Sequence, residues 1–310
     1  MLESAFAIGI VESGIRLSTP VLFAALGELI AERSGVLNLG VEGMMVMGAF
    51  TAFIGAYFTG NIFVGLVLAI SGPALMAALM AFLSISLRTN QLVAGLAIWL
   101  LGIGLTSLLY RLTFGVVTTA PKVQELHQIH ISILSIVPVF GPIFFQYDPL
   151  VYLGLLLVPL TQILIFKTDL GLKIRTVGEN PRQADAAGIN VTKIRYLAVI
   201  IGGALAGIGG SYLAVVTTGS FLDNITAGQG WIALAIVIFG RWKPFWILMG
   251  AWLFGMVDAL QLGLQAIGTV VPAEFLLMLP YVLPIGVMVA MYKRSDAPAA
   301  LTMPYRRHQR

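Results

Sequence analysis

Cysteine is absent from the sequence, histidine occurs only three times, and charged side chains are scarce. Without cysteine the chain can form neither disulfide bonds nor thiolate metal sites, and three histidines leave little for a metal cluster. We therefore expect no metal site and no bound cofactor. Charged residues make up 10% of the 310 residues, whereas a soluble domain carries about 25%. The composition excludes an ordinary soluble domain, and a net charge of +4 gives no indication of a nucleic-acid partner.

Two sequence features of enzymes are also missing. The chain has no G-x-x-x-x-G-K-[ST] phosphate loop, so it is not expected to hydrolyse ATP itself. No Ser/His, paired-Asp or metal-ligand constellation stands at matching depth in the apolar segments. A membrane-embedded enzyme is therefore disfavoured.

Long apolar segments are what the sequence has in abundance. Hydrophobic residues make up 58% of the chain, and the mean hydropathy is +0.94. The apolar runs extend over about 20 residues without the alternation of a barrel strand. This predicts an all-α, polytopic helical membrane protein in which residues 1–310 form a single transmembrane domain. The pattern Gly203-x-x-x-Gly207 predicts close contact between helices.

The apolar runs predict about nine to ten transmembrane helices, two of them broken or half-length. The expected segments are residues 5–30, 34–59, 62–87, 92–112, 149–166, 196–218, 231–239, 245–265 and 274–292. A tenth crossing would appear if residues 129–145 or the broken segment 34–59 crossed fully. Of the 18 Lys and Arg residues, 15 fall on one side of this topology, which the positive-inside rule places in the cytoplasm. The N-terminus is then outside, and residues 295–310 form a disordered basic tail inside.

Two segments, 34–59 and 217–240, fit a simple span poorly. Each begins with a polar, Gly-containing stretch and continues as an apolar helix, and the topology makes them enter from opposite sides. We interpret them as a weak inverted repeat, because paired interrupted helices mark the path in many transporters. Trp231 fits an interfacial aromatic belt better than a stacking platform for a base. The residues expected to line the translocation path are Asn38, Glu42, Gly43, Asp223, Gln229 and Asp258.

Each of these candidates has a simpler alternative. Glu42 could pair with a backbone N–H at the helix break. Asp258 and Gln261 could have a purely structural role, as hydrogen-bonding partners within the helix bundle. Asp223 and Gln229 could be solvated at the outside mouth. An acid inside a membrane segment is nevertheless a functional candidate by default.

Residues 167–195 form a highly charged loop between two long apolar helices. The loop holds six of the 18 Lys and Arg residues, interleaved with three acids. Asp169 could cap a helix that starts near Leu170, and Gly178 and Pro181 then predict two short helices joined by GENP. We interpret the loop as a docking knob for a soluble partner. The alternative is a solvated loop that merely follows the positive-inside rule.

The passage GLKIRTVGENPRQADAAGINVTKIRY resembles the coupling loop of permease subunits of bacterial ABC importers. Residues 17–50, together with TNQLVAGLAI at 89–98, resemble the branch that serves branched-chain amino acids, simple sugars and nucleosides. SGVLNLGVEGMM and VGENPRQADAAGI look most similar to the nucleoside and simple-sugar permeases. The resemblance covers about residues 16–294. The loop departs from the family in carrying Asp185 where Glu is usual.

The resemblance implies a multi-pass permease subunit of the bacterial plasma (inner) membrane with no ATPase site of its own. Its implied partners are an ABC ATPase subunit that binds ATP, a second permease subunit (a sister chain or a second copy), and an extracytoplasmic solute-binding protein. It adds the polar turn Asn90 and Gln91 to the translocation path. The loop residues implied to couple to the ATPase are Gly171, Arg175, Gly178, Glu179, Asn180, Pro181, Ala184, Ala187 and Gly188.

We therefore predict the permease subunit of an ATP-driven importer, which forms the translocation path for a small polar solute. By resemblance, nucleosides stand first, with simple sugars or amino acids behind them. The alternative is an ion-coupled secondary transporter of a small polar solute, in which Glu42 and Asp258 are the deep acids that could hold the coupling ion.

Overall fold

Helices make up nearly all of the described structure. A computed structural model describes residues 2–115, 119–127, 129–130, 146–268, 272–291 and 296–306. The fold is helical as predicted, and its one small addition among the described residues is a pair of two-residue strands, β1 (Ile129–His130) and β2 (Gln146–Tyr147), which pair antiparallel. The rest of the run 129–145 lies outside the described residues, and so does the question of whether it enters the membrane.

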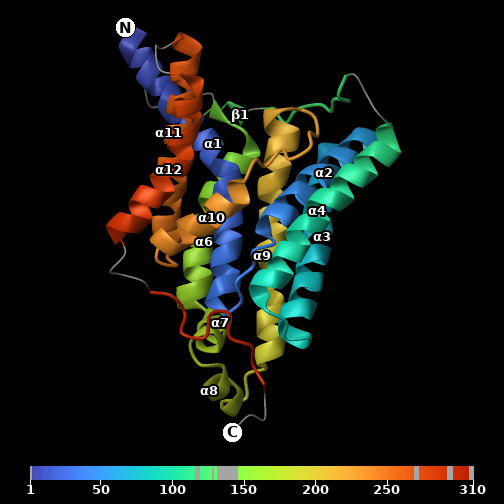
Figure 1. Cartoon of the computed structure of the whole chain (residues 1–310), viewed down its shortest axis with the longest axis vertical. Helices are drawn as coiled ribbons and strands as arrows, with labels where there is room; N and C mark the ends of the chain where they lie inside the picture. The colour runs from blue at the N-terminus through green and yellow to red at the C-terminus, as the bar shows by residue number, and fades with distance from the viewer. Residues whose placement is uncertain are drawn as a thin grey trace.

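The main bundle follows the predicted segments closely (Figure 1). Its helices are α1 (Leu2–Arg33), α2 (Val41–Thr59), α3 (Ile62–Ala81), α4 (Gln91–Phe114), α6 (Pro149–Lys167), α9 (Val191–Tyr212), α10 (Gln229–Phe239), α11 (Pro244–Ile267) and α12 (Ala273–Met291). The π-helical turns η1 (Phe82–Ser86) and η2 (Leu213–Thr217) extend α3 and α9. Two short helices, α7 (Asp169–Glu179) and α8 (Pro181–Ala186), project from one end of the bundle.

Within the described ranges, seven helices are long and apolar enough to cross a membrane. They are α1, α2, α3 with η1, α4, α6, α9 with η2, and α11. The helix α10 and the apolar part of α12, Glu274–Leu283, are shorter. The chain is thus a multi-pass helical membrane protein, and the half-length helix predicted near 231–239 is confirmed as α10.

Small residues bring α1, α2, α3 and α9 into close contact at the centre of the bundle. A Cβ added to Gly48 would lie 2.2 Å from the carbonyl oxygen of Gly207, and one added to Gly202 would lie 2.8 Å from that of Gly27. A Cβ on Gly203 would lie 2.4 Å from Ala77 of α3. Such contacts require glycine, and they confirm the close packing that the Gly-x-x-x-Gly pattern predicts.

Asp148 fixes the beginning of α6 near the outer end of α9. Its Oδ1 accepts hydrogen bonds from the backbone N–H groups of Leu150 and Val151, at 3.1 and 3.2 Å. Its Oδ2 accepts one from the Tyr212 hydroxyl at 3.1 Å. Burial raises the pKa of Asp148, although these hydrogen bonds act in the opposite direction. The cap thereby joins α6 to α9 through one side chain.

Both interrupted segments contain the breaks that the sequence predicts. Residues 34–40 are non-helical between α1 and α2, and residues 218–228 are non-helical between η2 and α10. The two segments approach one another in the middle of the bundle, where α2 and α10 begin (Figure 1). From this meeting point α2 runs toward the end with the N-terminus, and α10 runs toward the opposite end.

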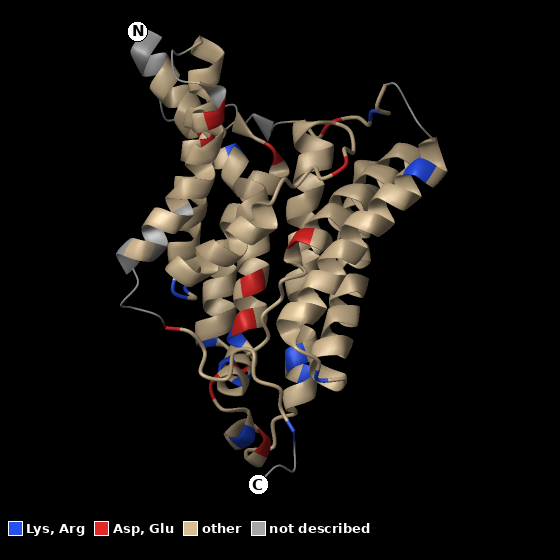
Figure 2. Ribbon diagram, viewed as in Figure 1, with Lys and Arg blue, Asp and Glu red and all other residues tan. Residues whose placement is uncertain are grey.

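Lys and Arg residues gather at the end of the bundle that carries α7 and α8 (Figure 2). We call it the basic end. Residues 296–306, within the tail predicted to be disordered, instead lie against this end. Asp296 forms an ion pair with Arg241 at 2.6 Å, and the Ala300 N–H donates to the Gly178 carbonyl at 2.8 Å. Ala300 is buried as a result.

Candidate functional site

The two interrupted segments are joined by the carboxylate of Glu42, in the first turn of α2. Glu42 is 1% exposed. Its Oε1 accepts hydrogen bonds from the Thr226 hydroxyl and from the Gly228 N–H at 2.8 Å, and its Oε2 accepts one from the Gly230 N–H at 2.6 Å. These N–H groups stand at the beginning of α10, where a helix leaves its first donors without partners. Glu42 therefore acts as an N-terminal cap supplied by another helix, which the helix dipole favours.

Glycines on the α10 side make this approach possible. A Cβ on Gly230 would lie 2.7 Å from both the Cα and the N of Glu42. Gly228 has a φ of +86°, a left-handed conformation that side chains other than glycine rarely adopt. The sequence TAGQG at 226–230 thus supplies the hydroxyl donor, the turn and the space for the carboxylate. We call the contact between Glu42 and residues 226–230 the midpoint junction.

The non-helical entry to α2 is held by buried polar side chains. The Asn38 N–H donates to Glu28 Oε1 at 2.8 Å, and the Asn38 Oδ1 accepts from the Gly40 N–H at 3.2 Å. The Leu37 N–H donates to Gln91 Oε1, also at 2.8 Å. These bonds satisfy backbone groups that the break in the helix leaves unpaired. Asn38 and Gln91 therefore shape the break, and both are buried.

Gly43 has a packing role beside the junction. A Cβ on Gly43 would lie 2.7 Å from the Cα of Trp99, so only glycine lets α2 approach α4 this closely. Asn90 lies at the exposed start of α4, where its Oδ1 accepts from the Leu92 N–H at 2.9 Å. Of the polar turn predicted at 90–91, one residue thus caps a helix and the other supports the break.

The remaining path candidates are more accessible. Asp223 is exposed, while Gln229 and Asp258 are half-buried. Gln229 Oε1 is a buried atom with no hydrogen-bond partner in the described structure. Gln229 belongs to the junction through its place at the start of α10, Asp223 lies in the preceding loop, and Asp258 lies on α11. The eight residues predicted to line the path therefore do not form one continuous lining. Five of them lie at the junction or at the non-helical entry to α2, namely Asn38, Glu42, Gly43, Gln91 and Gln229.

Sequence reasoning missed several contributors to the junction. Trp231 was expected in an interfacial belt, but its ring lies 5.5 Å from that of Trp99, centroid to centroid, with the planes at 82°. Trp99 is the ninth residue of the 24-residue α4, so the pair lies away from the ends of that helix. The Tyr281 hydroxyl of α12 donates to the Ala227 carbonyl at 3.0 Å. Thr226 also went unnoticed, although its place in TAGQG was a usable signal.

A second buried acidic group connects α1 to the corner between α10 and α11. Glu32 and Glu28 are four residues apart on α1, and both are buried. Glu32 Oε2 accepts a hydrogen bond from the Trp242 indole N–H. The Arg33 guanidinium donates to the Trp242 carbonyl, at 3.0 Å from Nη2. The charges of Glu28 and Glu32 in an otherwise apolar segment were visible in the sequence, but the partners of these acids were not.

The predicted coupling loop consists of two short helices, as expected. Asn180 stands between them: it ends α7, and its Oδ1 accepts from the Gln183 N–H at 3.1 Å to cap α8. The predicted cap of α7 needs a correction. Thr168 provides it, with its hydroxyl accepting from the Gly171 N–H at 3.1 Å, whereas Asp169 is the first helical residue. A threonine hydroxyl can cap as an aspartate does, so the pattern did not separate these neighbours.

The predicted coupling residues divide by exposure. Gly171 and Gly178 are buried, and a Cβ on either would lie within 2.1 Å of a backbone carbonyl oxygen, of Leu164 and of Arg33 respectively. Ala184 is also buried. These three residues set how closely the loop packs against the bundle. A partner could not reach them directly.

The other coupling residues are accessible to different degrees. Arg175 is half-buried, donating to the Ile165 carbonyl at 3.0 Å with its guanidinium over the Phe166 ring. Asn180 and Pro181 are also half-buried. The exposed residues of the loop 167–195 are Lys167, Asp169, Leu172, Lys173, Glu179, Arg182, Gln183, Ala186, Ala187, Gly188, Asn190, Thr192 and Lys193.

Most of the chain matches known transport proteins. A family model described as the permease component of branched-chain amino acid transport systems matches residues 10–291. A protein of Haloferax volcanii described as a glucose ABC transporter permease, TsgC13, is 42% identical over 84% of this chain and 79% of its own length. The guanosine ABC transporter permease NupQ of Bacillus subtilis is 36% identical over 96% of both chains. The nucleoside ABC transporter permease NupC of Lactococcus lactis is 35% identical over 91% of this chain and 92% of its own.

Among solved structures, an inward-facing ABC transporter described as of the metal-chelate type aligns with 92% of this chain and 85% of its own. The TM-score is 0.48 and the sequence identity 15%.

Proposed function

The chain belongs to the family of permease components of branched-chain amino acid transport systems, and on this premise we propose that it forms the translocation path for nucleosides in an ATP-driven importer. The family confirms the expectation of a membrane transport subunit, and the relatives are ABC transporter permeases. The ion-coupled secondary transporter weighed from the residues alone is set aside for that reason.

The midpoint junction is the observation that carries the proposal. One carboxylate joins the interrupted segments, and α2 and α10 leave it toward opposite ends of the bundle. In transporters, interrupted helices whose termini meet near the membrane midplane mark the binding path. We propose that α2 and α10 form a weak inverted repeat, and that the nine predicted segments all cross or enter the membrane.

We propose that the path runs beside the junction and not through it. Asn38, Glu42, Gly43 and Gln91 are buried and engaged, so they hold the two segments in place. Gln229 is the favoured contact for solute, because it is half-buried and its side-chain oxygen has no partner. Asp223 and Asp258 are further candidates, and Asn90 is assigned to the cap of α4.

An ABC ATPase subunit is the proposed partner at the coupling loop. The loop offers exposed polar residues on two short helices, and glycine contacts fix the first of them, α7, against α1 and α6. Movement of the loop would therefore be passed to the bundle as a rigid-body displacement. Rocking of α1 against α10 would then open the path alternately toward each side.

A second permease subunit and an extracytoplasmic solute-binding protein complete the proposed assembly. Long exposed leucine faces on α3 and α4 are available for lipid or for the second permease. We propose the plasma (inner) membrane as its location, with the basic end in the cytoplasm. The single-domain assignment is proposed because α1, α2, α3, α4, α6, α9, α10 and α11 all contribute buried residues to one core.

Nucleosides are proposed as the solute because two permeases described for guanosine and nucleosides match more than nine-tenths of this chain. Glucose is the second candidate, favoured by the 42% identity to TsgC13. Trp231 stands two residues after Gln229. Its ring packs against that of Trp99, and the two rings could pack against a planar base. Aromatic faces also pack against sugar rings, so the rings alone do not decide the solute.

The test is purification of the tagged chain from its native membrane, followed by uptake measurements. We expect an ATPase subunit and a second permease to remain bound. Radiolabelled guanosine uptake should require ATP and be competed by other nucleosides. Competition by glucose but not by nucleosides would establish the second candidate, and recovery of the chain without any ATPase would contradict the proposal.

A further inference from the structure

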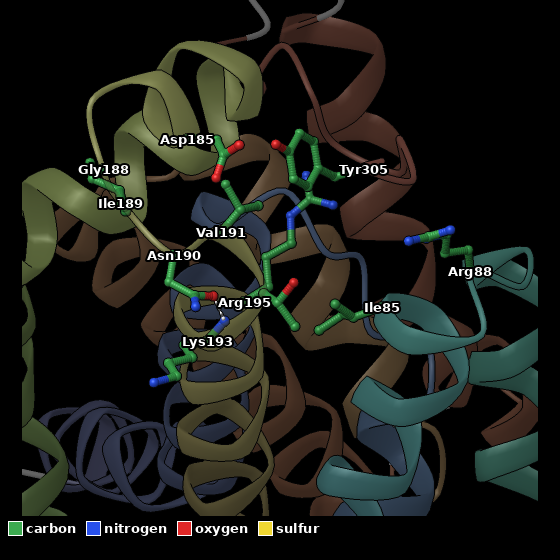
Figure 3. A pocket seen from close by; sticks show the side chains of 11 residues that line it. Ile85, Arg88, Asp185, Gly188, Ile189, Asn190, Val191, Lys193, Arg195 and Tyr305 are labelled. Atoms are coloured by element: carbon green, nitrogen blue, oxygen red, sulfur yellow. Dashed lines mark hydrogen bonds between the residues drawn. The ribbon is translucent and has the colours of Figure 1, made fainter. Parts of the chain in front are cut away.

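A hollow of about 430 Å³ opens at the basic end, between the coupling loop and the membrane helices (Figure 3). Its walls come from the end of η1, from the segment that follows α8, from the first turns of α9 and from the tail. Three cationic side chains line it: Arg88, Lys193 and Arg195. Asp185 is the one acid among the described lining residues, so positive charge is in excess.

Arg195 is a buried cation with no acid paired to it among the described residues. It is 1% exposed. Its Nε donates to the Ser34 carbonyl at 3.1 Å and its Nη1 to the Met303 carbonyl at 3.0 Å, while Nη2 has no hydrogen-bond partner. Within the described ranges it forms no ion pair. Burying a guanidinium without a counter-charge is unfavourable, and an anion in the hollow would compensate for it.

The other two cations extend this charge to the mouth of the hollow. Arg88 and Lys193 are exposed, and neither forms an ion pair with a described residue. The first turn of the 22-residue α9 also lines the hollow and adds the positive end of its helix dipole. Figure 3 shows that the Lys193 side chain extends away from Arg88 and Arg195, so the two guanidinium groups are the cations that face the hollow. Guanidinium groups at one concave site suit a phosphate group.

We propose that this hollow binds the phosphate group of an anionic phospholipid from the cytoplasmic leaflet. The hollow lies where α3 and α9 reach the basic end, the level at which lipid headgroups meet the protein. Leu87 beside Arg88 is 56% exposed, and Leu197, one turn beyond Lys193, is 40% exposed. Acyl chains could therefore lie against apolar side chains while the phosphate contacts the cations. A free phosphate shares the same chemistry and is the alternative source.

The bound lipid would also act on the coupling loop, an inference that rests on the proposed function. Residues 188–190, directly after α8, form one wall of the hollow, and the end of η1 forms another. A phosphate held between them fixes the loop relative to the membrane helices. Transport is then expected to require anionic lipid.

The whole purified transporter is reconstituted in nanodiscs of phosphatidylcholine with phosphatidylglycerol, and the retained lipid is identified by native mass spectrometry. The wild-type transporter is expected to retain phosphatidylglycerol in preference to phosphatidylcholine. In the double variant R88Q/K193Q, the preference for phosphatidylglycerol over phosphatidylcholine should fall about thirtyfold, since each cation near the surface contributes about one kcal/mol. R88K/K193R keeps the charges and should keep the preference. K173Q, on the exposed face of α7, is the matched control.

Lipid retention is measured without any transport assay, so the result does not depend on which solute the protein carries. Displacement of the lipid by millimolar inorganic phosphate would assign the site to free phosphate as well. Equal retention of both lipids by wild type, or unchanged preference in R88Q/K193Q, would overturn the proposal. Preference that appears only after the ATPase is removed would show that an acidic surface of that partner fills the hollow instead.

Discussion

At the scale of single residues, the midpoint junction depends on a carboxylate with three donors and on a glycine with no room beside it. Glu42 accepts from Thr226, Gly228 and Gly230, which belong to a segment nearly two hundred residues later. Its burial excludes water as a replacement partner. Loss of the Glu42 charge, or of the space beside Gly230, should therefore destabilise the packing of the bundle.

Glu42→Gln is expected to destabilise the protein and abolish solute uptake. The amide replaces one acceptor oxygen by an NH₂ group that faces N–H donors. Hydrogen bonds to charged groups contribute about 1.5–3 kcal/mol. The unfolding temperature in detergent and uptake in cells measure the two effects. Glu274→Gln, at an exposed acid in the first turn of α12, is the matched control and should behave as wild type.

Gly230→Ala tests the space at the same contact. The new methyl group would meet the backbone of Glu42 at 2.7 Å, so α10 must move away from α2. Overpacking of this kind costs about 1–3 kcal/mol. Gly104→Ala in α4 is the control, because nothing lies within 4 Å of its added Cβ. Equal thermal stability of the two variants would contradict the role given to Gly230.

At the scale of elements, the coupling loop presents α8 as its most projecting surface. Arg182 is exposed and forms no ion pair with a described residue. Arg175, by contrast, is held by the Ile165 carbonyl and the Phe166 ring, so it supports the loop from within. The two arginines should therefore respond differently to substitution.

Arg182→Glu should weaken binding of the ATPase without loosening the fold. The charge reversal changes only the exposed surface, so the unfolding temperature should stay within about 1 °C of wild type. Less ATPase should co-purify, and uptake should fall with it. Lys122→Glu, in the loop between α4 and α6, is the control, because it introduces the same charge reversal far from α8. Full ATPase recovery with Arg182→Glu would remove α8 from the proposed docking surface.

Most elements were predictable because their signals are local. Apolar length gave the long helices, and Gly178 with Pro181 gave two short ones in the loop. The partners of Glu42 were not predictable, because they lie on a segment far along the chain. The burial of Asn38 and Gln91 was missed for a related reason. Their amides satisfy backbone groups of a neighbouring segment, and no periodicity within a single helix records such a contact.

At the scale of the whole molecule, the tail connects three parts of the basic end. Asp296 pairs with Arg241 before α11, the Ala300 N–H donates to Gly178 of α7, and the Met303 carbonyl accepts from Arg195 of α9. The composition of the tail suggested disorder, because it is polar, basic and Pro-containing. Its order arises from backbone bonds to the folded bundle, which composition does not reveal.

Truncation after residue 295 should therefore lower stability, although the removed residues are outside the membrane helices. The Arg195 guanidinium and the Gly178 carbonyl each lose a partner, which costs about 1–3 kcal/mol in total. The unfolding temperature of the detergent-solubilised protein measures this loss. Removal of residues 307–310 alone spares these contacts and should have no effect. Equal effects of the two truncations would contradict the structural role of residues 296–306.

The central claim is that solute passes beside the junction of α2 and α10, and the absence of native cysteine allows a direct measurement of it. In the purified importer, Gln229→Cys is labelled with a membrane-impermeant maleimide, with and without ATP and nucleoside. Asn61→Cys, exposed at the end of α2, serves as the reference. We predict that nucleoside slows labelling at 229, that ATP changes it, and that labelling at 61 stays constant. Labelling at 229 that responds to neither ligand would contradict a path at the junction.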